Sequence, residues 1–338
     1  MAKPKLALIP AAQGTSLYSV LPSSGVGDFN FTRSGSATRI NSQGLIESVA
    51  NGVSRLNYPM IDGKVVGCPH HILEPARTNL VTYSEDISNS YWTKLGSSVT
   101  SGFTSPSGVD NAYKLVEDTS NGLHWMYSGG ITVTNATKYN VSVFAKKGER
   151  NSIRIAEKSG ISVIVNLESK DFDTISTGVI NSNITELVDD WVRIDYSFQT
   201  TSTSEEVYIY AADNGNINYQ GNGSSGIYVW GVQLEQLSYP TSYIPTSGAA
   251  STRLQDIANN SGNSDLINST EGVLYAEIAA LANDGTYRIF SLSDGTTNER
   301  VYIQYTSASN TVSAVVKKGG VTQANKGYVL SDETDFAK

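Results

Sequence analysis

The sequence Gly226-Ile-Tyr-Val-Trp-Gly-Val-Gln-Leu-Glu-Gln-Leu-Ser-Tyr-Pro-Thr-Ser-Tyr-Ile-Pro-Thr-Ser-Gly-Ala-Ala-Ser-Thr-Arg253 contains a strand that prolines bring to an end. Its first half alternates large apolar side chains, which predicts a strand with these four on one face: Tyr228, Trp230, Val232 and Leu234. Pro240 and Pro245 remove backbone donors, so the strand must end before them. A Ser/Gly/Ala/Thr-rich run follows. We therefore expect one domain to close here and another to begin.

Upstream of this strand, further strand patterns recur at the spacing typical of antiparallel sandwiches. They cover residues 112–116, 122–127, 139–146, 152–157, 162–166, 191–199, 206–211 and 226–235. Alternation places two sets of side chains each on one face: Tyr139, Val141, Val143 and Ala145, and Val192, Ile194, Tyr196 and Phe198. Eight strands in about 160 residues match a two-sheet jelly roll. No helical period persists beyond a turn or two, so we predict an all-β fold built on an antiparallel β-sandwich.

The two ends of the chain have different patterns. Residues 1–77 are rich in Gly and Ser turns and have too few apolar side chains for a core, which indicates an extended N-terminal arm. After a linker at 246–271, residues 272–338 alternate again at 273–278, 287–292, 300–305 and 311–317, with Asp-Gly turn signals. We expect a second, incomplete β-sandwich there. Either another chain supplies its missing edge or the chain is part of a longer protein. The jelly roll then occupies residues 78–245.

Composition excludes several classes of protein. The 338 residues are 39% hydrophobic and 17% charged. The excess of Tyr, 19 against 8 Phe and 4 Trp, favours β-sheets with partly solvent-exposed faces. A net charge of −8 argues against nucleic-acid binding. No run is long enough to span a membrane, and the N-terminus lacks the apolar core of a secretion signal. The single Cys68 excludes an internal disulfide, fits a reducing cytoplasm, and is expected to be a small buried hydrophobe.

Two segments carry a family resemblance. The first is Leu73-Glu74-Pro75-Ala76-Arg77-Thr78-Asn79-Leu80, followed by Ser84-Glu85-Asp86 and Tyr91-Trp92-Thr93-Lys94. It resembles the segment that opens the β module of many phage tail-fibre and head-fibre proteins, with Ile87 where the family usually has Phe. The second is Val229-Trp230-Gly231-Val232-Gln233-Leu234-Glu235 with its Tyr-Pro-Thr-Ser-Tyr-Ile-Pro-Thr tail, which resembles the closing segment. Phe31-Thr32-Arg33-Ser34-Gly35-Ser36-Ala37-Thr38-Arg39 resembles the preceding arm.

The resemblance covers about residues 28–255, and the two segments together are specific whereas either alone is only suggestive. It implies a virion structural protein with a carbohydrate-binding-module-like jelly roll, displayed on a phage tail or head. It further implies a homotrimer, made in the host cytoplasm, whose arm anchors it to other virion structural proteins and whose sandwich adheres to host-surface glycans. Beyond residue 272 the chain resembles, more weakly, the start of a concanavalin/laminin-G-like domain.

Little in the sequence supports catalysis. His70, His71 and Glu74 could suggest a metal site, but adjacent strand residues point to opposite faces and rarely chelate one ion. The carboxylate pairs Asp189–Asp190 and Asp171/Asp173 are expected in turns, where such side chains cap backbone groups. We therefore expect no enzyme and no cofactor. A polysaccharide depolymerase and a purely structural decoration protein stay open as alternatives, and so does structural calcium in the Asp-rich turns, although no loop has EF-hand spacing.

Glycan binding is the best-supported chemistry, because sugars stack on aromatic rings and pair with amides and carboxylates. The first candidate site is Tyr208 and Tyr210, on one face of a strand, together with the loop that follows them: Asp213, Asn214 and Tyr219. The second is Trp125 and Tyr127, two residues apart on another strand. The alternative is that these rings are ordinary packing on a half-buried sheet.

Overall fold

The computed structural model describes residues 3–10, 17–268 and 270–335, and it divides into two compact units, residues 1–263 and residues 264–338. Nearly all regular structure is β, which confirms the predicted fold class.

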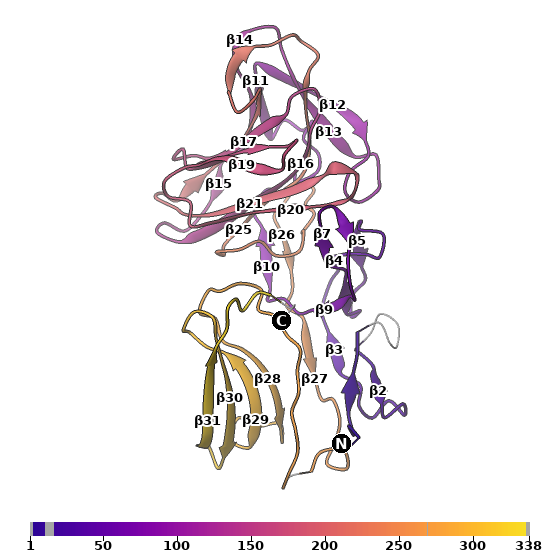
Figure 1. Ribbon diagram of the computed structural model, residues 1–338. Coiled ribbons are helices and arrows are strands. Elements are labelled where there is room, and N and C mark those ends of the chain that lie inside the picture. The colour runs from indigo at the N-terminus through magenta and orange to yellow at the C-terminus, as the bar shows by residue number, and fades with distance from the viewer. Residues whose placement is uncertain (1–2, 11–16, 269, 336–338) are drawn as a thin grey trace. The chain divides into compact units, whose positions relative to one another are not determined.

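Two antiparallel sheets form the body of the first unit (Figure 1). The first, here called sheet A, contains these strands in spatial order: β11 (Trp92–Leu95), β14 (Asn121–Ser128), β23 (Val207–Ala212), β17 (Ser152–Glu157), β18 (Ser162–Asn166) and β19 (Asp171–Ile175), with β24 (Asn218–Gln220) paired to β14. The second, sheet B, contains β12 (Ser97–Phe103), β13 (Ala112–Glu117), β25 (Gly226–Glu235), β16 (Lys138–Lys146), β21 (Val192–Gln199) and β20 (Asn181–Glu186). Each of the eight predicted strands is present.

The main hydrophobic core lies between sheets A and B. It includes both sets of side chains that alternation predicted to share a face: Tyr139, Val141, Val143 and Ala145 from β16, and Val192, Ile194, Tyr196 and Phe198 from β21. Sheet A contributes the side chains of its inner face to this core, for example Met126 and Ile209, which are fully buried. The period-two pattern of these strands is thus explained by one buried face each.

Strand β25 departs from the prediction that Tyr228, Trp230, Val232 and Leu234 share a face. Val232 and Leu234 lie in the core between the sheets, whereas Trp230 packs on the outer face of sheet B, with Tyr228 beside it. The cause is a β-bulge: Phe144 pairs with Trp230 and Ser142 pairs with Gln233, so three steps on β25 oppose two on β16. Gly231, at φ +61°, occupies the extra position. The prediction of one face was wrong, although Trp230 and Leu234 are both buried.

The N-terminal arm covers the outer face of sheet B. A second apolar cluster there contains Ala112, Phe144, Leu187, Trp191, Trp230 and Tyr243. Ile40, Ile46 and Met60 of the arm pack against it. The arm therefore gains its order by packing on the sandwich, while the outer face of sheet A carries half-buried aromatic side chains described below.

The arm is built from short two-stranded antiparallel ribbons. The pairs are β1 (Ala7–Leu8) with β2 (Ser19–Leu21), β4 (Ala37–Ile40) with β5 (Ile46–Val49), β6 (Arg55–Asn57) with β9 (His70–Ile72), and β7 (Met60–Ile61) with β8 (Lys64–Val65). Residues 246–271, expected as a linker, contribute two more strands: β26 (Ser251–Arg253) pairs with β10 (Arg77–Asn79), and β27 (Ile257–Asn259) pairs with β3 (Asn30–Thr32). Cys68 is exposed, so its prediction as a buried hydrophobe was wrong; it follows Gly67 in the turn that leads into β9.

The second unit contains one four-stranded antiparallel meander, drawn in yellow in Figure 1. Its strands are β28 (Arg288–Ser293), β29 (Arg300–Tyr305), β30 (Thr311–Lys318) and β31 (Val321–Val329). Residues 273–278 form no strand, contrary to the alternation of their sequence. This segment instead lies near the meander as an irregular chain, where the Ile278 carbonyl accepts a hydrogen bond of 2.9 Å from the Tyr305 hydroxyl.

Candidate functional site

Four of the five predicted aromatic residues lie together on the outer face of sheet A. Strands β14 and β23 are antiparallel neighbours, and their register places Trp125 opposite Tyr210 and Tyr127 opposite Tyr208. Because side chains alternate along a strand, His124 and Met126 point inward and are fully buried. The two candidate sites of the sequence are thus one site, called here the aromatic platform: Trp125, Tyr127, Tyr208 and Tyr210.

The rings of the platform stack in an offset manner. Trp125 and Tyr210 have centroids 5.2 Å apart and planes 5° from parallel, and Tyr127 and Tyr208 are 5.4 Å apart at 20°. Atoms in contact are about 3.5 Å apart, so parallel rings with these centroid distances are displaced sideways by roughly 4 Å. The rings therefore overlap only in part, and each ring has an area of its face that the neighbouring ring does not cover. Trp125, Tyr127 and Tyr208 are half-buried, while Tyr210 is 8% exposed.

Polar and apolar groups border the platform. The guanidinium of Arg154 on β17 lies 5.0 Å from the Tyr210 ring centroid, on the next strand of the sheet. Leu95 of β11, opposite Trp125, is 46% exposed. The Tyr208 hydroxyl donates a hydrogen bond to Glu206, which also pairs with Lys158 at 3.1 Å. Burial, and then the Glu206 carboxylate, raise the pKa of Tyr208, so this hydroxyl stays protonated and remains a donor at neutral pH.

The loop residues predicted beside Tyr208 and Tyr210 have structural roles. The Arg150 guanidinium donates two hydrogen bonds of 2.7 Å to Glu117 and pairs with Asp213 at 3.1 Å. The Tyr219 hydroxyl donates to the same Glu117 at 2.9 Å, and Arg150 covers the Tyr219 ring at 4.8 Å. Asn214 exchanges hydrogen bonds of 2.8 Å with Asn151, the residue just before β17. The structure does not bring these three residues into the platform.

The acidic residues considered for catalysis are placed apart from the platform rings. Asp189 and Asp190 lie in a short 3-10 turn, whereas Asp171 and Asp173 lie on strand β19 and not in a turn as predicted. Among the residues that the structure describes, no group of three or more His, Cys, Asp or Glu side chains is arranged to hold a metal ion. The same part of the chain contains no helix that is long and apolar enough to cross a membrane.

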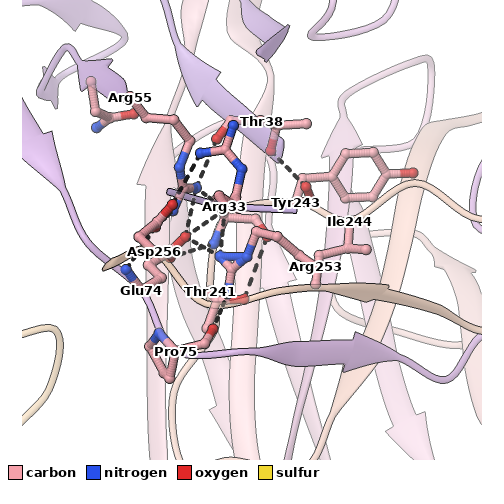
Figure 2. Close-up of polar contacts among 12 residues, drawn as sticks. Arg33, Thr38, Arg55, Glu74, Pro75, Thr241, Tyr243, Ile244, Arg253 and Asp256 are labelled. Carbon is pink, nitrogen blue, oxygen red and sulfur yellow. Dashed lines mark hydrogen bonds and ion pairs between the residues drawn. The ribbon is translucent and has the colours of Figure 1, made fainter. Parts of the chain in front are cut away.

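A buried ionic cluster ties the arm to the segment that follows the sandwich, and Figure 2 shows its contacts. Its members are Arg33, Arg55, Glu74, Arg253 and Asp256. Arg55 pairs with Glu74 at 2.7 Å and also with Asp256, Arg33 pairs with Asp256 at 3.0 Å, and Arg253 pairs with Glu74. All five side chains are at most 5% exposed. We call this group the arginine–carboxylate cluster.

The cluster assigns a structural role to both segments that carry the family resemblance. Glu74 belongs to the opening segment, and its carboxylate accepts hydrogen bonds of 2.8 and 2.7 Å from the backbone and side chain of Ser242 in the closing segment. Burial alone would raise the pKa of Glu74, but the Arg253 and Arg55 charges lower it to about 2. Asn79 adds a buried amide that bonds to the Val232 and Ile244 carbonyls. Sequence reasoning missed the cluster because three of its four ion pairs join residues that are 179 to 223 positions apart.

No protein-family profile matches the chain, and no curated protein matches its sequence. One similar solved structure is the CBM22-1–GH10 part of Clostridium thermocellum endo-1,4-beta-D-xylanase 10B with xylohexaose, at 11% identity and TM-score 0.28 over 51% of this chain and 30% of that one. Another is the mannan-recognising carbohydrate-binding module TmCBM27, at 8% identity and TM-score 0.26 over 49% and 98%. The chain thus spans about 30% of the xylanase fragment. Likeness at these scores assigns neither residues nor activity.

Proposed function

We propose that this chain is a structural subunit of a phage fibre or other virion appendage that adheres to host-surface glycans through the aromatic platform. The observation that carries the glycan part is the platform itself: four rings from two neighbouring strands, stacked with offset, on the outer face of sheet A. The opposite outer face, on sheet B, is covered by the arm, so the two faces of the sandwich have different tasks.

The chemistry of the platform suits a sugar. The C–H face of a pyranose packs on the uncovered part of a ring, and hydroxyls beside it find polar partners at the border of the platform. Covering about 60 Å² of aromatic surface is worth about 1.5 kcal/mol. Two rings therefore supply a substantial part of the affinity of a weak glycan complex, and each contributes roughly tenfold in Kd.

The virion part of the proposal rests on the sequence resemblance of residues 28–255. In this proposal the protein is made in the host cytoplasm, is displayed on the virion as a homotrimer, contacts other virion structural proteins through its N-terminal arm, and has no catalytic activity. Residues 26–79 already pack on or pair with other parts of the first unit, so in this proposal the docking contact with the virion falls to the part of the arm before Val26.

The test is retention of the purified full chain on a glycan array and on polysaccharide from phage hosts. We expect Trp125→Ala and Tyr208→Ala each to weaken binding about tenfold, and the double variant to abolish it. Tyr287→Ala serves as the control, because Tyr287 is an aromatic residue of the second unit that is 55% exposed. Near-ultraviolet circular dichroism checks that each variant is folded.

Two results would oppose the proposal. Binding that survives the double variant would move the glycan site elsewhere, and no retention of the wild type on any glycan would favour the purely structural alternative. Release of reducing ends from a bound polysaccharide would instead favour a depolymerase. Virions that incorporate a chain starting at Val26 as well as the full chain would remove the anchoring role of the arm.

A further inference from the structure

Arg154 continues the row of rings in the platform. Across the sheet, Trp125, Tyr210 and Arg154 lie on adjacent strands in direct register. The guanidinium is 5.0 Å from the Tyr210 centroid, close to the 5.2 Å between Tyr210 and Trp125. Tyr210 is therefore enclosed between an indole and a cation, which explains why it is the most buried of the four rings. A planar guanidinium stacked on a ring keeps its N–H groups directed outward in the ring plane, where they can donate.

The Arg154 charge has no counterion within the described residues. Arg150 pairs with Glu117 and Asp213, and Arg193 donates to the Thr241 carbonyl and to Ser142. For Arg154 the described part of the chain provides neither a hydrogen-bond acceptor nor a carboxylate within bonding distance. Its side chain is half-buried, and its nitrogen atoms are not among the buried polar atoms that lack a partner, so solvent reaches them.

The residues beside Arg154 on the same face are uncharged. Its register partners are Tyr210 and Ile164, and Ser152 and Ala156 flank it along β17. Glu206, which accepts a hydrogen bond from the Tyr208 hydroxyl, forms an ion pair with Lys158 at 3.1 Å, so these two residues add no net charge to the border of the platform. In a chain of net charge −8, an unpaired arginine at the end of an aromatic row is a directed donor for an anionic group and not part of a general basic surface.

We propose that the platform selects an acidic glycan, with the carboxylate of a uronic acid bound by Arg154 while a neighbouring sugar stacks on the rings. This inference rests on the proposed function of the platform and names its ligand class. A carboxylate matches the fork of a guanidinium with two parallel hydrogen bonds. Such charge-assisted bonds are strong enough to change affinity by about tenfold or more.

The experiment compares each of two acidic polymers, polygalacturonate and alginate, with its own carboxyl-reduced form. The immobilised polymers are titrated with the full chain, and the two forms of each differ only in having a carboxylate or a primary alcohol at the same position. We expect the wild type to bind the acidic form about tenfold more tightly, Arg154→Gln to bind both forms equally, and Arg154→Lys to recover part of the preference. Lys138→Gln, which removes an exposed cation from sheet B, should keep the full preference.

Binding of the reduced polymers also reports whether Arg154→Gln has disturbed the rings. The proposal is supported if Arg154→Gln loses only the preference for the acidic form. Equal wild-type binding to both forms, with loss in Trp125→Ala, would overturn the acidic preference and leave the glycan platform in place. A preference lost equally in Lys138→Gln would mean general electrostatics and would also overturn it. Absence of retention on every polymer would overturn the acidic ligand, and the glycan array then decides separately whether the platform binds sugars at all.

Discussion

Arg33 and Asp256 are 223 residues apart in the sequence and form an ion pair of 3.0 Å whose side chains have no exposed surface. Arg55, Arg253 and Glu74 complete the arginine–carboxylate cluster, so three arginines surround two carboxylates. Burying charges is costly unless each is paired and bonded, so the arm and the residues after the sandwich must come together in one arrangement. The cluster makes the arm an integral part of the first unit.

Asp256→Asn should therefore be strongly destabilising. The change leaves the buried Arg33 guanidinium without its carboxylate partner and leaves Arg55 with Glu74 alone, and breaking a buried pair in this way typically costs about 3–5 kcal/mol. Urea unfolding followed by tryptophan fluorescence measures the loss. Glu47→Gln is the control, because the Arg39–Glu47 pair at 2.9 Å is partly exposed and should contribute less than about 1 kcal/mol. Equal effects of the two changes would show that the cluster is not energetically special.

The buried carboxyl groups of Glu205 and Asp195 should contribute less stability as the pH rises from about 5 to about 8. Burial, and then the nearby Glu157 charge, raise the pKa of Glu205 to about 7, and burial raises the pKa of Asp195 to about 6. In the unfolded chain both groups titrate near pH 4, so between these values the folded protein holds protons that the unfolded chain has released. Stability from these groups is complete below about pH 4 and is lost as the pH passes through 6 and 7. Burial lowers the pKa of His71 to about 4, which makes stability rise with pH up to about 6.5, so the fall in Tm measured by thermal unfolding should be clearest between about pH 6.5 and about pH 8.

Glu205→Gln should flatten that profile. The Gln carbonyl can still accept the hydrogen bonds that Glu205 receives from the backbone of Lys158 at 2.7 Å and of Glu206 at 3.1 Å, without the buried charge. The variant should be more stable than the wild type at about pH 8 and similar at about pH 4. Glu168→Gln, at an exposed position, is the control. An unchanged pH profile in Glu205→Gln would exclude Glu205 as its source.

The bulge in β25 should not tolerate a side chain. Gly231 has φ +61°, and an added Cβ would lie 2.7 Å from the Phe144 ring and 3.2 Å from that of Tyr243. Gly231→Ala should lower the free energy of unfolding by at least about 2 kcal/mol, from backbone strain and overpacking together. Gly122→Ala, where nothing lies within 4 Å of the added Cβ, is the matched control in a strand. Equal stability of the two variants would show that the bulge can relax.

The sequence predicts the sandwich well because each core strand buries one face, as in β16 and β21, and a period of two records that directly. It fails at β25 because one glycine shifts the register and sends Trp230 to the opposite face from Val232. For the candidate site, alternation found both aromatic pairs but could not join them. Their union depends on β14 and β23 being neighbours, a long-range pairing that no local pattern encodes.

In the loop after β23, the sequence predicted binding residues that the structure does not place in the site. Their polar groups suggested sugar binding but form hydrogen bonds and ion pairs within the protein. Tyr219→Phe removes the hydroxyl that donates to Glu117 at 2.9 Å, so we expect a loss of about 1–2 kcal/mol in the free energy of unfolding. Glycan retention should be unchanged, since Tyr219 packs against Arg150 and His124 and not against the platform rings. Tyr228→Phe on sheet B, whose hydroxyl donates no hydrogen bond to the described residues, controls for loss of a phenol. Reduced glycan retention in a folded Tyr219→Phe protein would return the loop to the binding site and would require a ligand that extends beyond the platform.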